Sequence, residues 1–118
     1  MAKEAKVDYD EDNDILYVYS GEKAKDSLEI DNFVLDISAD NKVVAVEIFN
    51  ASVFASKLSG IKITKEVLSA VEKAVMSFYQ SKELFYVFII LPIKVGGVEK
   101  EINLQVPAPA AIMVNPTS

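Results

Sequence analysis

Hydrophobic and polar residues alternate over much of this chain, and such alternation is typical of β-strands that bury one face. The clearest stretch is residues 33–52, FVLDISADNKVVAVEIFNAS. With Ala39–Lys42 as the turn, it predicts a β-hairpin whose opposed apolar residues share one face: Phe33 with Ile48, Leu35 with Val46, and Ile37 with Val44. Asp36 and Glu47 then lie at diagonal positions on the other face.

Two short helices are expected between this hairpin and the C-terminal part of the chain. The first covers Ala51–Leu58, with Asn50 at its N-cap position. The second covers about Lys65–Lys73 and begins at the N-cap Thr64; its apolar stripe has helical spacing and consists of Val67, Leu68 and Val71. Ser52, like the two N-cap residues, is interpreted as a capping residue rather than a binding group.

Alternation returns between residues 75 and 106 and predicts a three-stranded antiparallel meander. Residues 75–80 could also extend the second helix. We expect a strand, because a loop over residues 80–83 then sets apolar residues opposite each other, Met76 with Val87 and Phe78 with Phe85. Gly96-Gly97 is a favoured two-residue turn and pairs the last two strands as Lys94–Glu99, Leu91–Ile102, Ile89–Leu104 and Val87–Val106.

Further strands are predicted over Lys6–Asp10, Ile15–Ser20 and Ser27–Ile30. The whole pattern predicts an α+β fold in which antiparallel β-hairpins and meanders form two layers with two short helices. We expect residues 1–59 to form a hairpin half and residues 60–118 to form a helix, a three-stranded meander and a tail, both within one compact domain.

Short motifs in the first half carry a family resemblance. They are Tyr9-Asp10, residues 14–18 (DILYV), residues 43–48 (VVAVEI) and residues 50–52 (NAS). This pattern, which covers roughly Val7 to Phe54, resembles the DUF2283 family of small prokaryotic proteins of uncharacterised function. The resemblance implies no known activity and supplies no catalytic residue.

Composition excludes several kinds of chemistry. The 118 residues include neither cysteine nor histidine, which excludes thiol nucleophiles, disulfides, Cys/His zinc sites and histidine bases. The net charge is −6 and every basic residue is a lysine, so binding to nucleic acid is disfavoured. The longest apolar run, residues 84–91, is far shorter than the ~20 residues of a membrane helix. Without a signal peptide at the start, we expect a cytoplasmic protein that does not bind membranes.

Two groups of carboxylates are candidate sites. Asp36 and Glu47 could share acid–base catalysis, since two carboxyl groups roughly 5–8 Å apart can acquire different pKa values. The alternative, which we favour, is an exposed polar sheet face. The run DYDEDND at residues 8–14 lacks the glycine and glutamate of a calcium-binding EF-hand loop, so we expect an acidic turn without metal.

Tyr86, Phe88 and Ile90 form a second apolar face on their strand and are candidate interface residues, because monomers seldom leave such a face open. We therefore predict a non-enzymatic protein-binding or assembly module that acts as a homodimer, needs no cofactor and could bind a basic partner protein. One alternative is a small hydrolase or lyase that uses Asp36 and Glu47. Another is a small-ligand-binding protein whose cavity is lined by tyrosines or phenylalanine, namely Tyr17, Tyr19 or Phe88.

Overall fold

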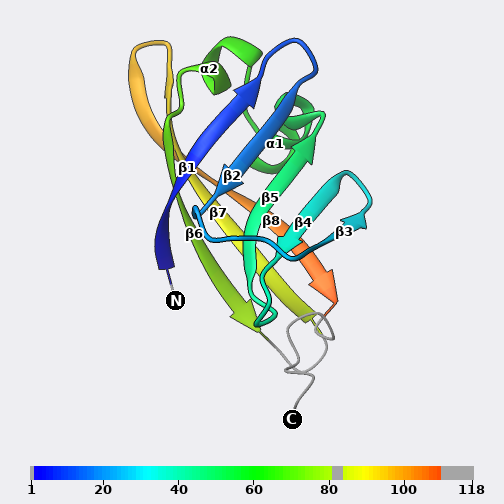
Figure 1. Cartoon of the computed structure of the whole chain (residues 1–118). Coiled ribbons are helices and arrows are strands. Elements are labelled where there is room, and N and C mark those ends of the chain that lie inside the picture. The colour runs from blue at the N-terminus through cyan, green and yellow to red at the C-terminus, as the bar shows by residue number, and fades with distance from the viewer. Residues whose placement is uncertain (1, 81–83, 110–118) are drawn as a thin grey trace.

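The computed structural model describes residues 2–80 and 84–109, whose strands form one antiparallel sheet (Figure 1). Within these residues the sheet has eight strands in the order β3-β4-β5-β2-β1-β6-β7-β8. Their bounds are Ala2–Asp10 (β1), Ile15–Tyr19 (β2), Asp26–Ile30 (β3), Phe33–Ile37 (β4), Val43–Phe49 (β5), Lys73–Gln80 (β6), Leu84–Val95 (β7) and Val98–Pro109 (β8). The pairing of β1 with β6 joins the strands of the first half to the last three strands.

The sheet curls into a half-barrel, and this corrects the expected α+β fold of two layers (Figure 1). The two helices of the described residues are short: α1 spans Ala51–Ser59 and α2 spans Lys65–Ser69. The expectation of two layers was wrong because alternation shows only which side of each strand is apolar. Two stacked sheets and one curled sheet both produce inward-facing residues at every second position.

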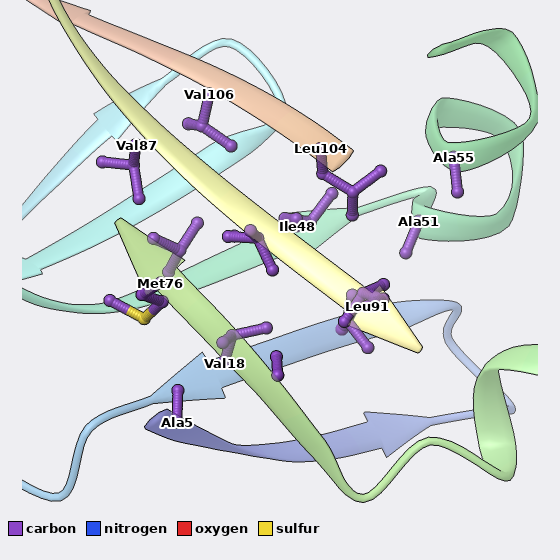
Figure 2. Packing of buried hydrophobic residues seen from close by; sticks show 14 of the residues in the cluster. Ala5, Val18, Ile48, Ala51, Ala55, Met76, Val87, Leu91, Leu104 and Val106 are labelled. Carbon is purple, nitrogen blue, oxygen red and sulfur yellow. The ribbon is translucent and has the colours of Figure 1, made fainter. Parts of the chain in front are cut away.

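The inner face of the curled sheet holds one core cluster to which strands of both halves contribute. Figure 2 shows Leu104 of β8 and Leu91 of β7 in the same cluster as Ile48 of β5 and Val18 of β2. All four side chains are fully buried. The buried residues of the helices belong to this cluster as well: Ala51, Ala55 and Leu68. No helix of the described residues is long and apolar enough to cross a membrane.

Apolar residues of the β4–β5 hairpin lie on one buried face, as predicted. The pairs Phe33–Ile48 and Leu35–Val46 are confirmed. Ile37 pairs with Val43 rather than with the predicted partner, because the register shifts between Asp36 and Ile37. A shift of this kind leaves one residue of the bulged strand without a partner, and at this place the extra residue is Val44.

The strand expected over residues 75–80 is confirmed as part of β6, so the longer-helix alternative is wrong. The four predicted β7–β8 pairs are confirmed. The β6–β7 register differs by two residues, since Met76 pairs with Ile89 and Phe78 with Val87. A shift of two keeps every side chain on its predicted face. Residues 81–83 of the expected loop and 110–118 of the expected tail lie outside the described residues.

Candidate functional site

The outer face of the sheet is the surface on which the candidate residues lie. Neither helix contributes a buried residue to it, because the buried side chains of both helices pack into the inner cluster. The strand registers arrange the outer side chains in rows that run across the sheet. One row consists of Asp8, Tyr17, Glu47 and Val34, and the next consists of Lys6, Tyr19, Ala45 and Asp36.

Tyr17 occupies the centre of this region. Its ring stacks on that of Tyr19, with centroids 4.9 Å apart and an interplanar angle of 22°. Its hydroxyl donates a 3.3 Å hydrogen bond to Oδ2 of Asp36, and the hydroxyl of Ser27 donates to Oδ1 at 2.8 Å. Burial raises the pKa of the Tyr17 hydroxyl, and the negative charges of Asp36 and Glu47 raise it further. Tyr17 is therefore a neutral hydrogen-bond donor on this face.

Asp36 and Glu47 lie on adjacent strands at diagonal positions of the outer face. A hollow of about 190 Å³ is lined by Glu47 and by residues of β1 and β2: Asp8, Asp10, Ile15 and Tyr17. Asp36 is not part of this lining, so the hollow does not contain both carboxylates. Within the described residues, no group of three or more acidic side chains is arranged to hold a metal ion. A catalytic role for the pair stays a prediction.

A buried carboxylate that sequence reasoning missed lies at the start of α1. Asp14 is 7% exposed and accepts three hydrogen bonds: 2.6 Å from the Tyr9 hydroxyl, 3.0 Å from the backbone N–H of Ser52 and 2.7 Å from its hydroxyl. The backbone carbonyl of Asp14 also accepts from the N–H of Ala51 at 3.0 Å. Asp14 thus satisfies two N–H groups that the first turn of a helix leaves without partners.

This arrangement corrects the expected capping of α1. Asn50 does occupy the N-cap position, but it has a left-handed backbone and its side chain makes no capping hydrogen bond. The cap comes instead from Asp14, which is 38 residues from Ser52 in the sequence. Thr64, by contrast, is confirmed as a capping residue, since its hydroxyl accepts from the N–H of Val67.

The hydrogen bonds around Asp14 determine its charge state. Burial acts to raise its pKa, but the hydrogen bonds from Tyr9 and Ser52 outweigh burial, and the pKa of Asp14 is lowered. The pKa of the Tyr9 hydroxyl is raised strongly, first by burial and then by the hydrogen bond to Asp14 and the negative charge of Asp14. The pair is therefore an ionised acceptor with a neutral donor near neutral pH. The Asp14 carboxylate thereby joins β1, through Tyr9, to α1, through Ser52.

The predicted interface residues Tyr86, Phe88 and Ile90 are half-buried on the outer face of β7. They lie opposite Tyr79, Ser77 and Val75 of β6 and, as predicted, opposite Pro107, Gln105 and Asn103 of β8. The rings of this region approach one another, with centroids 6.2 Å apart for Tyr86 and Phe88 and 6.4 Å apart for Tyr79 and Tyr86. We call Val75, Tyr79, Tyr86, Phe88 and Ile90 the apolar patch.

A second hollow, of about 540 Å³, lies between α2 and the β7–β8 hairpin. It is lined by Val67, Ala70, Val71, Pro92, Ile93, Lys94, Glu99, Lys100 and Glu101. The three residues expected to line a ligand cavity, Tyr17, Tyr19 and Phe88, are absent from this lining, and Tyr17 lines only the smaller hollow. The ligand-binding alternative stays a prediction.

Comparison with known proteins confirms the resemblance over part of the chain. Residues 6–52 match the model of DUF2283, which is described as a protein of unknown function. An uncharacterised protein of Methanocaldococcus jannaschii is 46% identical over 48 residues, or 40% of this chain and 41% of that protein. A protein of Methanosarcina mazei, provisionally named a hypoxanthine phosphoribosyltransferase, is 42% identical over 48 residues, or 40% of this chain and 39% of that protein.

The shared region is limited, since the chain spans about two fifths of the length of each of these relatives. No solved structure matches the chain. The region that matches DUF2283 contains the complete Asp14 cluster of Tyr9, Asp14 and Ser52, as well as Tyr17 and Glu47 of the outer face. It ends before β6, so the apolar patch lies outside the match.

Proposed function

We propose that this protein is a non-enzymatic assembly module that forms a homodimer through the apolar patch. The observation that carries the proposal is the cluster of three aromatic rings, Tyr79, Tyr86 and Phe88, on the outer face of β6 and β7. Around the three rings the neighbours on the described part of the outer face are uncharged, namely Ser77, Gln105 and Pro107. At its other end the patch adjoins charged residues, because Val75 and Ile90 line a hollow with Glu4, Lys73 and Glu101. Tyr79 is 56% exposed and Val75 is 36% exposed, so apolar surface remains open to water. Interfaces are depleted of charge at their centres and enriched in aromatic side chains.

A symmetric dimer suits this surface. In a two-fold interface the same patch contacts itself, so it must be complementary to its own copy. The aromatic centre of the patch meets this requirement, because two copies bring no like charges together there. Charged residues also lie beyond the patch toward the β7–β8 turn, where Lys94 and Glu99 are opposite each other. Such a polar rim around an apolar centre is typical of specific interfaces.

The likeness to the Methanosarcina relative covers too little of that protein to support a shared activity. The shared segment covers 39% of that protein. In this chain the outer face of the shared segment carries Asp8, Asp10 and Glu47, whose negative charges would repel an anionic phosphate substrate.

The test measures molar mass by light scattering during gel filtration over a range of protein concentrations. The variant is V75E/Y79E, which introduces two charges at exposed positions of the patch. Its matched control is V53E/V98E, since Val53 and Val98 are 53% and 56% exposed and lie outside the patch. We expect a dimer of twice 13.0 kDa for the natural protein and the control, and a monomer for the variant. A monomeric natural protein at the highest concentration would refute the proposal.

A further inference from the structure

The other half of the outer face carries aromatic rings surrounded by negative charge. Tyr17 lies between Asp8 on β1 and Glu47 on β5, because the strand registers set it opposite both. Asp36 lies in the next row and accepts a hydrogen bond from the Tyr17 hydroxyl. We call this region, which also includes the second ring of the stacked pair and a further carboxylate, the acidic aromatic face: Asp8, Asp10, Tyr17, Tyr19, Asp36 and Glu47.

Within the described part of the chain, no carboxylate of this face forms an ion pair. The ion pairs formed there are Lys3–Glu22 and Lys42–Asp40, and neither includes a residue of the acidic aromatic face. In the two rows that contain Tyr17 and Tyr19, the basic residue is Lys6. The negative charge therefore remains available to a positively charged partner.

The rings add a second kind of attraction to the charge. Tyr17 and Tyr19 are half-buried and stacked, so the face between the carboxylates is apolar and aromatic. A cation that lies over a tyrosine ring is attracted to it, and a planar guanidinium group stacks on the ring better than an ammonium group does. The hollow of about 190 Å³ beside Tyr17 has carboxylates of both β1 and β5 in its lining.

We infer that the acidic aromatic face binds a basic segment of a partner protein. An arginine or lysine side chain of this segment lies against the Tyr17 ring, and its charge lies between Asp8 and Glu47. Arginine is bound more tightly than lysine, because the guanidinium group both stacks and forms paired hydrogen bonds with carboxylates. The inference goes beyond the proposed homodimer, since it concerns another surface and another protein.

The probes are three labelled peptides of equal length, rich in arginine, lysine or glutamate, and the measurement is fluorescence anisotropy. The variant D8N/E47Q removes two charges from the face while keeping the shapes of the side chains. Its matched control, E99Q/E101Q, removes two charges from exposed positions of β8. We expect the arginine-rich peptide to bind about tenfold more weakly to D8N/E47Q, which corresponds to ~1.4 kcal/mol, and to bind equally well to the control.

A third variant tests the contribution of the ring. In Y17L an apolar side chain remains but the aromatic face is lost, so the preference for arginine over lysine is expected to disappear. Circular dichroism of each variant checks that the fold is intact. Amide NMR shifts on adding the arginine-rich peptide should concentrate on β1, β2 and β5.

Several outcomes would overturn the inference. One is an equal loss of binding in D8N/E47Q and E99Q/E101Q, which would indicate attraction to net charge alone. Others are no binding of the arginine-rich peptide, or equal binding of the glutamate-rich peptide. If D8N/E47Q dissociates the dimer, the face is occupied by a second copy and the inference is wrong. The monomeric V75E/Y79E protein should still bind the peptide, so failure of the dimer proposal leaves this test intact.

Discussion

The two halves of the curled sheet follow the same alternation but use it differently. On the inner face both halves supply apolar side chains to one cluster. On the outer face the first half surrounds Tyr17 with carboxylates, whereas the last three strands present an apolar patch whose aromatic rings have uncharged neighbours. Hydrophobicity alone does not separate these surfaces, because both contain exposed or half-buried aromatic rings. The presence of charge separates them and indicates different partners for the two faces.

The halves also differ in how they are held together. The first half contains the buried carboxylate of Asp14, which joins the β1–β2 turn to the start of α1. In the last three strands, the described buried side chains are all apolar. The difference teaches that the segment matching DUF2283 carries a buried polar cluster that orients a helix, while the described part of the last three strands has an apolar interior.

The largest expected effect tests whether the halves share one core. Ile48→Ala in β5 and Leu104→Ala in β8 each remove a fully buried side chain. Each should destabilise the protein by about 2–5 kcal/mol, because the lost burial and the remaining cavity both cost free energy. Urea unfolding monitored by circular dichroism should show a single transition for both variants. Two transitions, with each substitution shifting only one, would show that the halves fold separately.

The next effect concerns the polar cluster. Asp14→Asn should destabilise the protein by about 1–3 kcal/mol, because the hydrogen bonds from Tyr9 and Ser52 then lose a charged acceptor. Asparagine is the suitable substitution, since Asp14 has a φ of 56° and asparagine tolerates this backbone conformation. The matched control is Asp12→Asn in the same turn, where the side chain is exposed. Equal stability of the two variants would contradict the capping role of Asp14.

The cluster also predicts how stability depends on pH. The pKa of Asp14 is lowered from 3.8 in the folded protein, so its contribution is present above about pH 4 and is lost as the pH falls through the folded pKa. The pKa of Tyr9 is raised from 10.0, so its contribution is present below about pH 10 and is lost as the pH rises toward the folded pKa. Thermal unfolding at a series of pH values measures this dependence. Asp14→Asn should make the melting temperature less sensitive to pH on the acid side, and Tyr9→Phe should do so on the alkaline side.

Sequence reasoning succeeded where a local pattern decides the structure. Leu35 with Val46 and Ile89 with Leu104 were predicted from alternation and turn residues alone. The register of β6 against β7 was predicted wrongly. A shift of two residues keeps Met76 on the same face, so alternation does not distinguish the two registers. The strand over residues 75–80 was predicted for the same local reason as the hairpins.

Contacts between distant segments could not be predicted in the same way. The pairing of β1 with β6 makes one sheet out of the expected two layers, and no periodicity in either strand specifies its neighbour. The Asp14–Ser52 contact joins residues 38 apart. A signal was present, since Tyr9, Asp14 and Ser52 all belong to the motifs that resemble DUF2283. What the sequence could not show is that these motifs meet through hydrogen bonds.

The smallest expected effect compares one tyrosine from each half of the outer face. Tyr17→Phe removes a hydroxyl that donates to Asp36 at 3.3 Å, whereas the Tyr79 hydroxyl bonds no described residue. Because the Tyr17 bond is long and partly exposed, its loss should cost about 0.5 kcal/mol, and Tyr79→Phe should cost less. Tyr79→Phe should also leave the proposed dimer intact, since the aromatic ring remains in the patch. Urea unfolding measures the loss of stability in both variants, and light scattering measures their molar mass. A larger loss of stability in Tyr79→Phe than in Tyr17→Phe would mean that hydrogen bonding to a carboxylate does not distinguish the two faces.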